Sequence, residues 1–237
     1  MSEIALITGG SGDIGKYIAK YISQNYQYKL YITYNKNDSI KEELKDYNIE
    51  CLQCDLTIPE KCEELVNNLI KVGNVTLLIN NTGITKANKI ENMSYEEWDS
   101  VISTNLSSNF YMIKNIIKHM KEINKGRIIN MSSVYGIKGS IGLSNYCASK
   151  FGIIGFTKAL ALEVAQYNIT ANVICPGFTD RGLVKYIENR ILDKIIKEKV
   201  PSKKLVDIDN INYAIDMIIK SSSINGSVIT IDEGITC

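Results

Sequence analysis

This chain of 237 residues has a single histidine, nearly balanced charge and no long apolar run. A Ser-His-Asp hydrolase triad would have to use the single histidine, His119, which we expect to be solvated at a Lys-rich helix end, and no G-x-S-x-G nucleophile elbow accompanies it. No apolar run approaches the ~20 residues that span a bilayer, so we expect no membrane segment. Lys plus Arg number 27 against 26 Asp plus Glu, which leaves no basic excess to attract nucleic acid. Residues 1–3 carry no basic n-region, and we expect a cytoplasmic protein.

The six cysteines predict free thiols rather than a disulfide framework, because the protein is expected to be intracellular. Cys51 and Cys54 have the C-x-x-C spacing, but positions three apart in a strand point to opposite faces. No further pair of ligands follows at a spacing suited to zinc. We therefore expect no metal site and interpret the pair as small buried side chains.

Short apolar segments alternate with helical patterns along the whole chain. Almost all of these segments are apolar throughout, which is typical of a parallel sheet covered by helices on both faces. Right-handed crossovers on such a sheet make a doubly wound Rossmann-type fold. With no linker or repeat, the sequence predicts a single α/β domain over residues 1–237. Strands are expected at 3–8, 29–34, 51–55, 75–79, 126–132, 170–175 and 227–231, and helices at 16–25, from 39, 59–72, 146–165, 181–199 and 208–221.

A glycine-rich turn joins the first predicted strand to the first predicted helix. Gly9, Gly12 and Gly15 are spaced three apart in it. Glycines let the backbone approach a pyrophosphate, and a helix N-terminus offers unpaired N–H groups and a positive dipole end. The strand–turn–helix context predicts a dinucleotide-binding site.

Tyr146 and Lys150 stand four residues apart in a predicted helix, so the phenol and the ammonium share one face. A tyrosine with a pKa near 10 is a poor proton shuttle at neutral pH. A neighbouring ammonium favours the phenolate, so we expect Lys150 to lower the pKa of Tyr146 and make it a usable general acid. Taken alone, Y-x-x-x-K is better explained as a surface pair on a helix.

Together these motifs resemble the short-chain dehydrogenase/reductase family. The stretch Thr8–Gly15 is similar to the family motif T-G-x-x-x-G-x-G, with Asp13 in place of the middle glycine. A carboxylate there is unfavourable beside a pyrophosphate unless it points away or caps the helix. The resemblance extends from Thr8 to Gly177, and residues 225–234 match the family more weakly.

The resemblance implies hydride transfer between a nicotinamide cofactor and a carbonyl carbon. Ser133, thirteen residues before Tyr146, matches the family serine that donates to the substrate carbonyl. Tyr146 would deliver the proton, and Lys150 would tune Tyr146 and bind the nicotinamide ribose. Asn105 matches the asparagine that helps hold a water relay to the lysine.

The resemblance also implies a set of cofactor-binding residues. Asp55 would lie at the adenine edge or simply cap a turn, and the stretch 80–83 resembles N-N-A-G, which also steadies the sheet. Residues 33–37 contain no acid for the ribose 2′-OH, and Lys36 either pairs a 2′-phosphate or is solvated. We therefore favour NADP(H) over NAD(H). The full set is Gly9, Ser11, Gly12, Ile14, Gly15, Lys36, Asp55, Leu56, Asn81, Gly83, Tyr146, Lys150, Pro176 and Gly177, after which Arg181 replaces the usual family threonine.

Segments 81–85, 126–130, 155–159 and 176–178 look most like β-ketoacyl-carrier-protein reductases and acetoacetyl-CoA reductases. Residues 181–204 carry eight basic and three acidic side chains. A basic lid there would suit a phosphate-bearing acyl group such as one on acyl carrier protein, although a solvated amphipathic helix explains the same pattern. Arg127 matches one arginine of such reductases, but Tyr167 stands where a second is common.

Three functions stay open at this point. An NADPH-dependent β-ketoacyl thioester reductase leads, followed by a dehydrogenase of another alcohol, sugar or sterol. A non-catalytic nucleotide-binding family member would be expected to lose part of the Ser133, Tyr146 and Lys150 set. The resemblance further implies a homotetramer that packs through helices near 105–122 and 147–164.

Overall fold

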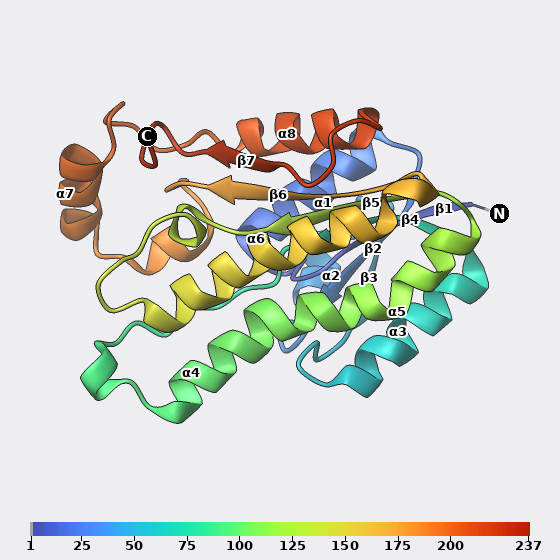
Figure 1. Ribbon diagram of the computed structural model, residues 1–237, viewed down its shortest axis with the longest axis horizontal. Coiled ribbons are helices and arrows are strands. Elements are labelled where there is room, and N and C mark those ends of the chain that lie inside the picture. The colour runs from blue at the N-terminus through green and yellow to red at the C-terminus, as the bar shows by residue number, and fades with distance from the viewer. Residues whose placement is uncertain (1) are drawn as a thin grey trace.

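Seven parallel strands form the centre of the structure, a computed structural model that describes residues 2–237 (Figure 1). Their order in the sheet is β3-β2-β1-β4-β5-β6-β7, and every neighbouring pair is parallel. This confirms the predicted doubly wound α/β fold. The strands are β1 (Glu3–Ile7), β2 (Lys29–Tyr34), β3 (Ile49–Gln53), β4 (Asn74–Asn80), β5 (Gly126–Met131), β6 (Ile169–Pro176) and β7 (Val228–Ile231).

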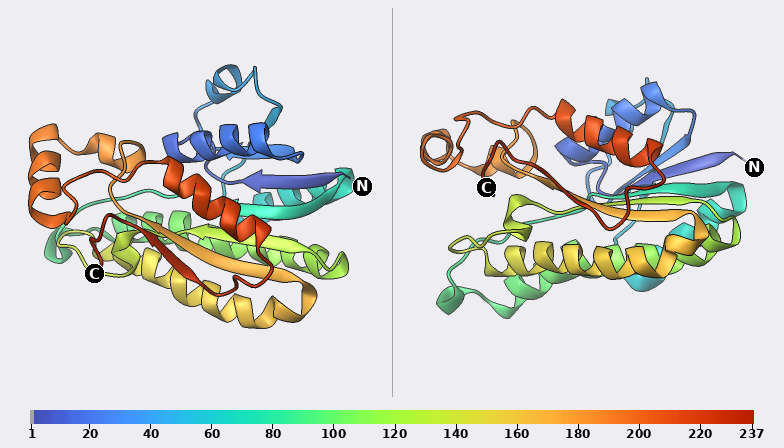
Figure 2. Two further views of the ribbon diagram at one scale, coloured as in Figure 1. Left: turned by 90° about the horizontal axis from the view of Figure 1, so that it is seen from above. Right: turned by 45° about the horizontal axis from the view of Figure 1, so that its top comes forward.

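Helices cover both faces of the sheet, as the two views of Figure 2 show. Ile18, Ile40 and Ile211 bring three helices into the apolar cluster on one face. On the other face, Leu65, Met112 and their neighbours belong to a second cluster. The first face carries α1 (Asp13–Asn25), α2 (Ile40–Glu43) and α8 (Asp209–Lys220). The second carries α3 (Pro59–Val72), α5 (Ser108–Glu122) and α6 (Ser144–Val164), and the shorter α4 (Tyr95–Ile102) leads into α5.

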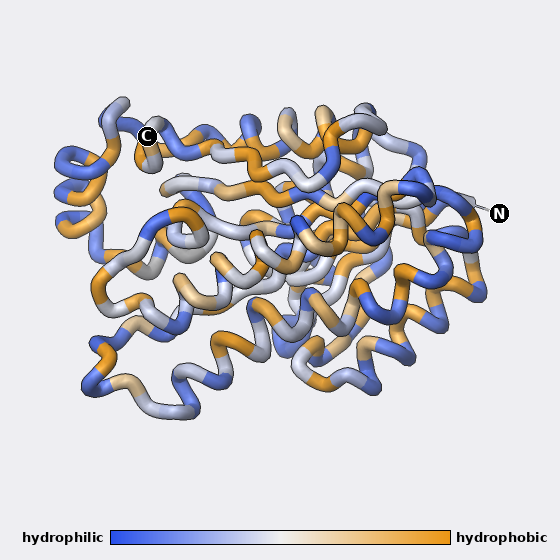
Figure 3. Tube along the Cα trace, in the orientation of Figure 1, coloured by the Kyte–Doolittle hydropathy of each residue, from blue (hydrophilic) through white to orange (hydrophobic). Residues whose placement is uncertain are grey.

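The strands are apolar because helices cover both of their faces. All eight residues of β6 are buried, and so are Ile4 to Ile7 of β1. In Figure 3 apolar residues gather along the central strands, whereas α7 (Asn189–Lys199) turns polar residues outward. Within residues 2–237, no helix has both the length and the apolar character needed to cross a membrane.

Three local expectations need correction. The helix expected from Ser39 is a single turn, Ile40–Glu43. The helix expected over 181–199 is divided into a 3-10 turn, Gly182–Tyr186, and α7, because Ile187 and Glu188 between them have ψ angles of 129° and 133°, which no helix allows. His119 is half-buried rather than solvated, and burial lowers its pKa.

Candidate active site

The carboxyl ends of the strands surround a cavity of about 650 Å³. It lies where the strand order reverses between β1 and β4, the place where doubly wound sheets bind ligands. Its volume falls in the range of small-molecule and cofactor sites. Its lining includes Gly9, Ser11, Gly12, Ile14, Gly15, Asp55, Leu56, Asn81, Gly83, Tyr146, Lys150 and Pro176 from the expected set.

The turn between β1 and α1 is shaped for a close-lying ligand. Gly9 has a φ of 64°, which glycine adopts without strain. A Cβ atom on Gly15 would lie 2.4 Å from the Gly9 carbonyl oxygen and 2.6 Å from Asn81 Nδ2. Position 15 therefore accepts only glycine, and the turn stays open as a cradle for a ligand. Its backbone N–H groups at the start of α1 fit the pyrophosphate of a dinucleotide.

Asn81 and Thr8 hold this turn against the end of β4. Asn81 Nδ2 donates to the carbonyl oxygens of Thr8 at 3.3 Å and Gly9 at 3.2 Å. Thr8 Oγ1 accepts from the backbone N–H groups of Asn81 at 3.0 Å and Thr82 at 3.2 Å. Asn81 thus acts on the turn structurally as well as lining the cavity. The buried Thr8 was not among the expected site residues, although its place in the glycine motif is a signal for it.

Asp55, just after β3, lies between the cavity and a turn that it caps. It lines the cavity, and its Oδ1 accepts from the Thr57 hydroxyl at 2.7 Å and the Thr57 N–H at 3.1 Å. Hydrogen bonding from Thr57 holds the pKa of Asp55 below its usual value. Lys36 is exposed and lies outside the cavity lining, which at the end of β2 consists of Thr33, Tyr34 and Asn35.

Tyr146 and Lys150 come from the first two turns of α6, and both are buried. The Lys150 ammonium donates to the Met131 carbonyl oxygen at 2.8 Å and lies 5.7 Å from the centre of the Tyr146 ring. The Ser133 hydroxyl, just after β5, accepts from the Tyr135 N–H at 3.2 Å and lies close enough to the Tyr146 phenol to act on its pKa. The fold therefore brings all three side chains together.

The expected fall in the pKa of Tyr146 is wrong for this structure. Burial raises the pKa of Tyr146 to about 12, and the hydrogen bond from Ser133 opposes this only in part. Burial lowers the pKa of Lys150 to about 8. The ammonium is directed at Met131 rather than at the phenol oxygen, so it does little to favour a phenolate. At neutral pH the phenol keeps its proton, which is the state a proton donor requires.

Asn105 lies behind the cavity, in a π-helical turn, Ser103–Ser107, between α4 and α5. Its Oδ1 accepts from the Ile84 N–H at 2.8 Å, and its Nδ2 donates to Ile84 O at 2.9 Å and Ser149 Oγ at 3.1 Å. A Cβ atom on Gly83 would lie 3.4 Å from Lys150 Nζ and 3.6 Å from Asn105 Oδ1. Gly83 therefore keeps open the space between the amide and the ammonium.

Asn145, which sequence reasoning missed, anchors the start of α6. It is fully buried, and its Nδ2 donates to the carbonyl oxygens of Lys86 at 3.0 Å and Glu97 at 3.2 Å. Its Oδ1 accepts from the Tyr146 N–H at 2.7 Å. These bonds fix the helix turn that carries Tyr146. An asparagine at a predicted helix start was the available signal, because asparagine favours such positions.

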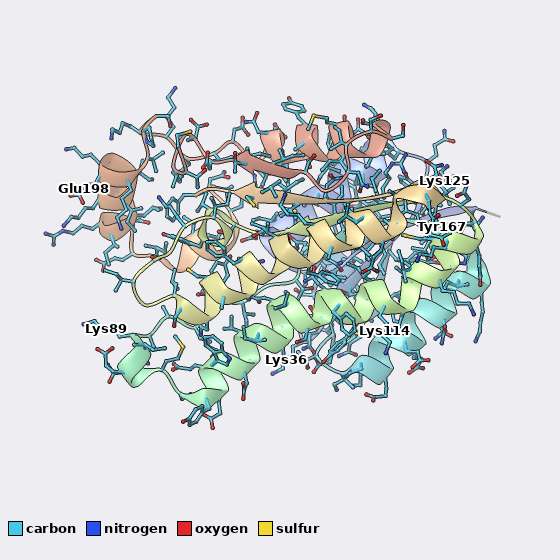
Figure 4. All side chains as sticks on the ribbon, viewed as in Figure 1. Lys36, Lys89, Lys114, Lys125, Tyr167 and Glu198 are labelled. Atoms are coloured by element: carbon cyan, nitrogen blue, oxygen red, sulfur yellow. The ribbon has the colours of Figure 1, made fainter. Side chains whose placement is uncertain are left out.

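Two further expectations concern the ends of the strands. Gly177 lies outside the cavity lining and packs against Asp232, where a Cβ atom would come within 2.8 Å of Asp232 Cα. Arg127 is the second residue of β5 and therefore lies at the end of the sheet opposite the cavity. In Figure 4, Tyr167 likewise lies at the opposite end of the molecule from Glu198 of α7. Arg127 and Tyr167 thus do not line the cavity.

Fold and site together define a Rossmann-type dinucleotide-binding enzyme with a serine, a tyrosine and a lysine at its cavity. The model of the short chain dehydrogenase family matches residues 3–191. The chain belongs to this family.

Named relatives span the whole chain. It is 35% identical to the acetoacetyl-CoA reductase of Shinella zoogloeoides, over 99% of this chain and 98% of the relative. It is 32% identical to the 3-oxoacyl-[acyl-carrier-protein] reductase FabG of Staphylococcus epidermidis, over 99% of each chain. A variant of the actinorhodin polyketide ketoreductase, solved with NADPH, superposes with a TM-score of 0.92 at 27% identity, over 99% of this chain and 97% of that one.

Proposed function

We propose that this enzyme reduces a β-ketoacyl thioester, linked to acyl carrier protein or CoA, to the β-hydroxyacyl thioester with NADPH. The observation that carries the chemistry is that the buried Tyr146 and Lys150 line the cavity of the glycine turn, with the buried Ser133 beside the Tyr146 phenol. The nicotinamide cofactor supplies the hydride when bound. Ser133 donates a hydrogen bond to the substrate carbonyl, and Tyr146 delivers the proton to that oxygen.

The choice of a thioester rests on the relatives and on charge. Two relatives are named for β-ketoacyl substrates on CoA and on acyl carrier protein. We further propose that residues 181–204, the lid segment, close over the substrate. This segment carries five more basic than acidic side chains, and α7 stands out at one end of the molecule (Figure 4). A local positive potential speeds the encounter with an anionic acyl carrier.

The preference for NADP(H) over NAD(H) rests on the end of β2. No acidic side chain follows this strand in residues 33–37 to hold a ribose 2′-OH. Lys41 lies over the Tyr34 ring at 5.4 Å, and Lys36 stands two residues beyond Tyr34. We propose that one or both cations pair with the 2′-phosphate. The KM for NADPH should then rise in Lys36→Ala and Lys41→Ala, while the KM for NADH stays constant.

We also propose a cytoplasmic homotetramer. Phe110 of α5 and Phe151 and Leu162 of α6 are exposed, with Leu162 at 84%. Exposed apolar side chains gathered on neighbouring helices are typical of a protein interface. The test is the molar mass in solution, which should be four times 26.5 kDa.

The function is tested by following NADPH absorbance with acetoacetyl-CoA, an acetoacetyl carrier protein, and a panel of ketones, sugars and sterols. The proposal expects turnover with a thioester and its near-complete loss in Tyr146→Phe. Turnover only with a ketone, sugar or sterol would favour a different dehydrogenase. Cofactor binding with no turnover on any substrate would favour a non-catalytic family member.

A further inference from the structure

Asp13 departs from the family's glycine motif, and the structure gives its side chain a partner far along the chain. It is the first residue of α1, whose N-cap, Gly12, provides no side-chain cap. Asp13 Oδ2 instead lies 2.8 Å from Lys185 Nζ, in the lid segment. Hydrogen bonding to Lys185 holds the pKa of Asp13 below its usual value, and the Gly182 N–H contributes to this. The lid segment therefore supplies the cation that balances this carboxylate.

The second departure from the family pattern, Arg181, reinforces the same contact. Its guanidinium carbon lies 4.9 Å from the centre of the Tyr17 ring, on the second turn of α1. The Tyr17 hydroxyl in turn donates to Asp209 Oδ1 at 2.6 Å, which fixes the ring against α8. Arginine stacked on a tyrosine face gains cation–π attraction.

Gly182 makes the close approach between these two segments possible. Its φ of 76° is one that a larger residue adopts only with strain, and a Cβ atom there would lie 3.0 Å from Ile14 Cδ1. Both Gly182 and Asp13 line the cavity. The start of the lid segment therefore sits on the first turn of α1, at the mouth of the site that takes the cofactor's phosphates.

We infer that the Asp13–Lys185 ion pair is a clasp that holds the lid segment over the phosphate-binding turn and slows the departure of the bound dinucleotide. Asp13 and Lys185 are in this view positioning residues for the lid. The inference rests on dinucleotide binding in this cavity and not on the identity of the substrate. The pair is partly exposed, with side-chain exposures of 28% and 53%, so its effect is modest. Such pairs change a rate by roughly two- to five-fold.

The test is the rate at which NADPH leaves the full-length enzyme, measured by stopped-flow fluorescence after mixing with excess non-fluorescent NADP+. Lys185→Met should release NADPH roughly two- to five-fold faster than the wild type at low salt. Added salt should speed release from the wild type and narrow this difference, because salt screens a partly exposed pair. Lys194→Met is the matched control, since it removes a lid cation that has no ion pair with Asp13.

A double-mutant cycle separates the clasp from a general disturbance of the lid. Lys185→Met should speed release in the wild-type background and should have no further effect in Asp13→Asn, where the pair is already broken. Hydrogen exchange of residues 182–188 without cofactor should follow the same pattern. Unchanged release in Lys185→Met, or an equal acceleration by Lys185→Met in Asp13→Asn, would overturn the clasp.

These outcomes are independent of the proposed function, because no thioester takes part in them. If NADPH is released faster from the clasp variants but no thioester is reduced, the proposed substrate is wrong and the clasp stands. If thioesters are reduced and the release rate does not depend on Lys185, the clasp is wrong and the proposed function stands.

Discussion

Replacing Lys150 with methionine should make the unliganded protein more stable while it removes a residue of the proposed active site. Lys150 is 3% exposed, and burial lowers its pKa from 10.5 to about 8. At neutral pH the fold therefore holds a charged group in surroundings that disfavour the charge. Each pKa unit is 1.36 kcal/mol, so this fall corresponds to roughly 3 kcal/mol of lost stability.

Methionine keeps an unbranched chain in the same space and carries no charge. It also gives up the hydrogen bond to the Met131 carbonyl, whose loss costs about 1 kcal/mol. The net expectation is a gain of about 2 kcal/mol at pH 7, which for a domain of this size raises Tm by roughly 4–8 °C. The measurement is thermal unfolding followed by circular dichroism. Lys158→Met is the control, because Lys158 lies on the same helix with an exposed side chain.

The pH dependence identifies the cause. Below pH 8 Lys150 is charged in both the folded and the unfolded chain, so the penalty on the fold is at its full size. Between pH 8 and 10.5 the folded protein gives up this proton first, and the penalty fades. The advantage of Lys150→Met should therefore be largest at pH 7 and nearly absent at pH 10.5. A variant with a lower Tm than the wild type at pH 7, or with the same gain at both pH values, would refute this reasoning.

Three more predictions follow from single contacts. Gly15→Ala should weaken NADPH binding at least about 10-fold by calorimetry, since its Cβ would enter the phosphate cradle; Gly139→Ala, with nothing within 4 Å, is the control and should bind normally. Ser133→Ala should lower kcat by about 10²–10³ and leave the Kd for NADPH constant, because it removes a donor to the reacting carbonyl; an equal loss of binding would contradict that role. Asp216→Asn should lose about 1–2 kcal/mol of unfolding free energy at pH 7, because Tyr26 donates to this carboxylate at 2.5 Å. Burial raises the pKa of Asp216, but hydrogen bonds from Tyr26 and others outweigh it and hold the value below 3.8, so the loss should shrink as the pH falls below 3.8. A loss in Asp216→Asn that does not change with pH in denaturant titrations would point to another cause.

Strand positions were predictable from the sequence because each depends on local composition. The segment expected at 29–34 is β2 with the same bounds, and the one expected at 75–79 is one residue shorter at each end than β4. A strand buried on both faces needs apolar residues at every position, so its hydropathy reports its environment directly. The helix at 59–72 was equally predictable, because proline is favourable in the first turn of a helix. The structure has this helix with the same bounds, followed by Gly73 at its C-cap.

Part of the site was also predictable, since residues four apart on a helix must share a face. That geometry placed Tyr146 beside Lys150, and the family motif added Ser133. The electrostatic state of the pair was not predictable in this way. Whether an ammonium lowers a phenol's pKa depends on burial and on where the ammonium points, and here it points to Met131 O.

The sequence by itself therefore determined most of the strands and long helices and the pairing of Tyr146 with Lys150, because these follow from neighbours along the chain. Tertiary structure alone decided that Asp13 meets Lys185, that Asn105 sits in a π-helical turn behind Lys150, and that Lys36 lies outside the cavity. Desolvation and ion pairing act over a few ångströms in space, and residues far apart in sequence acquire such distances only when the chain folds.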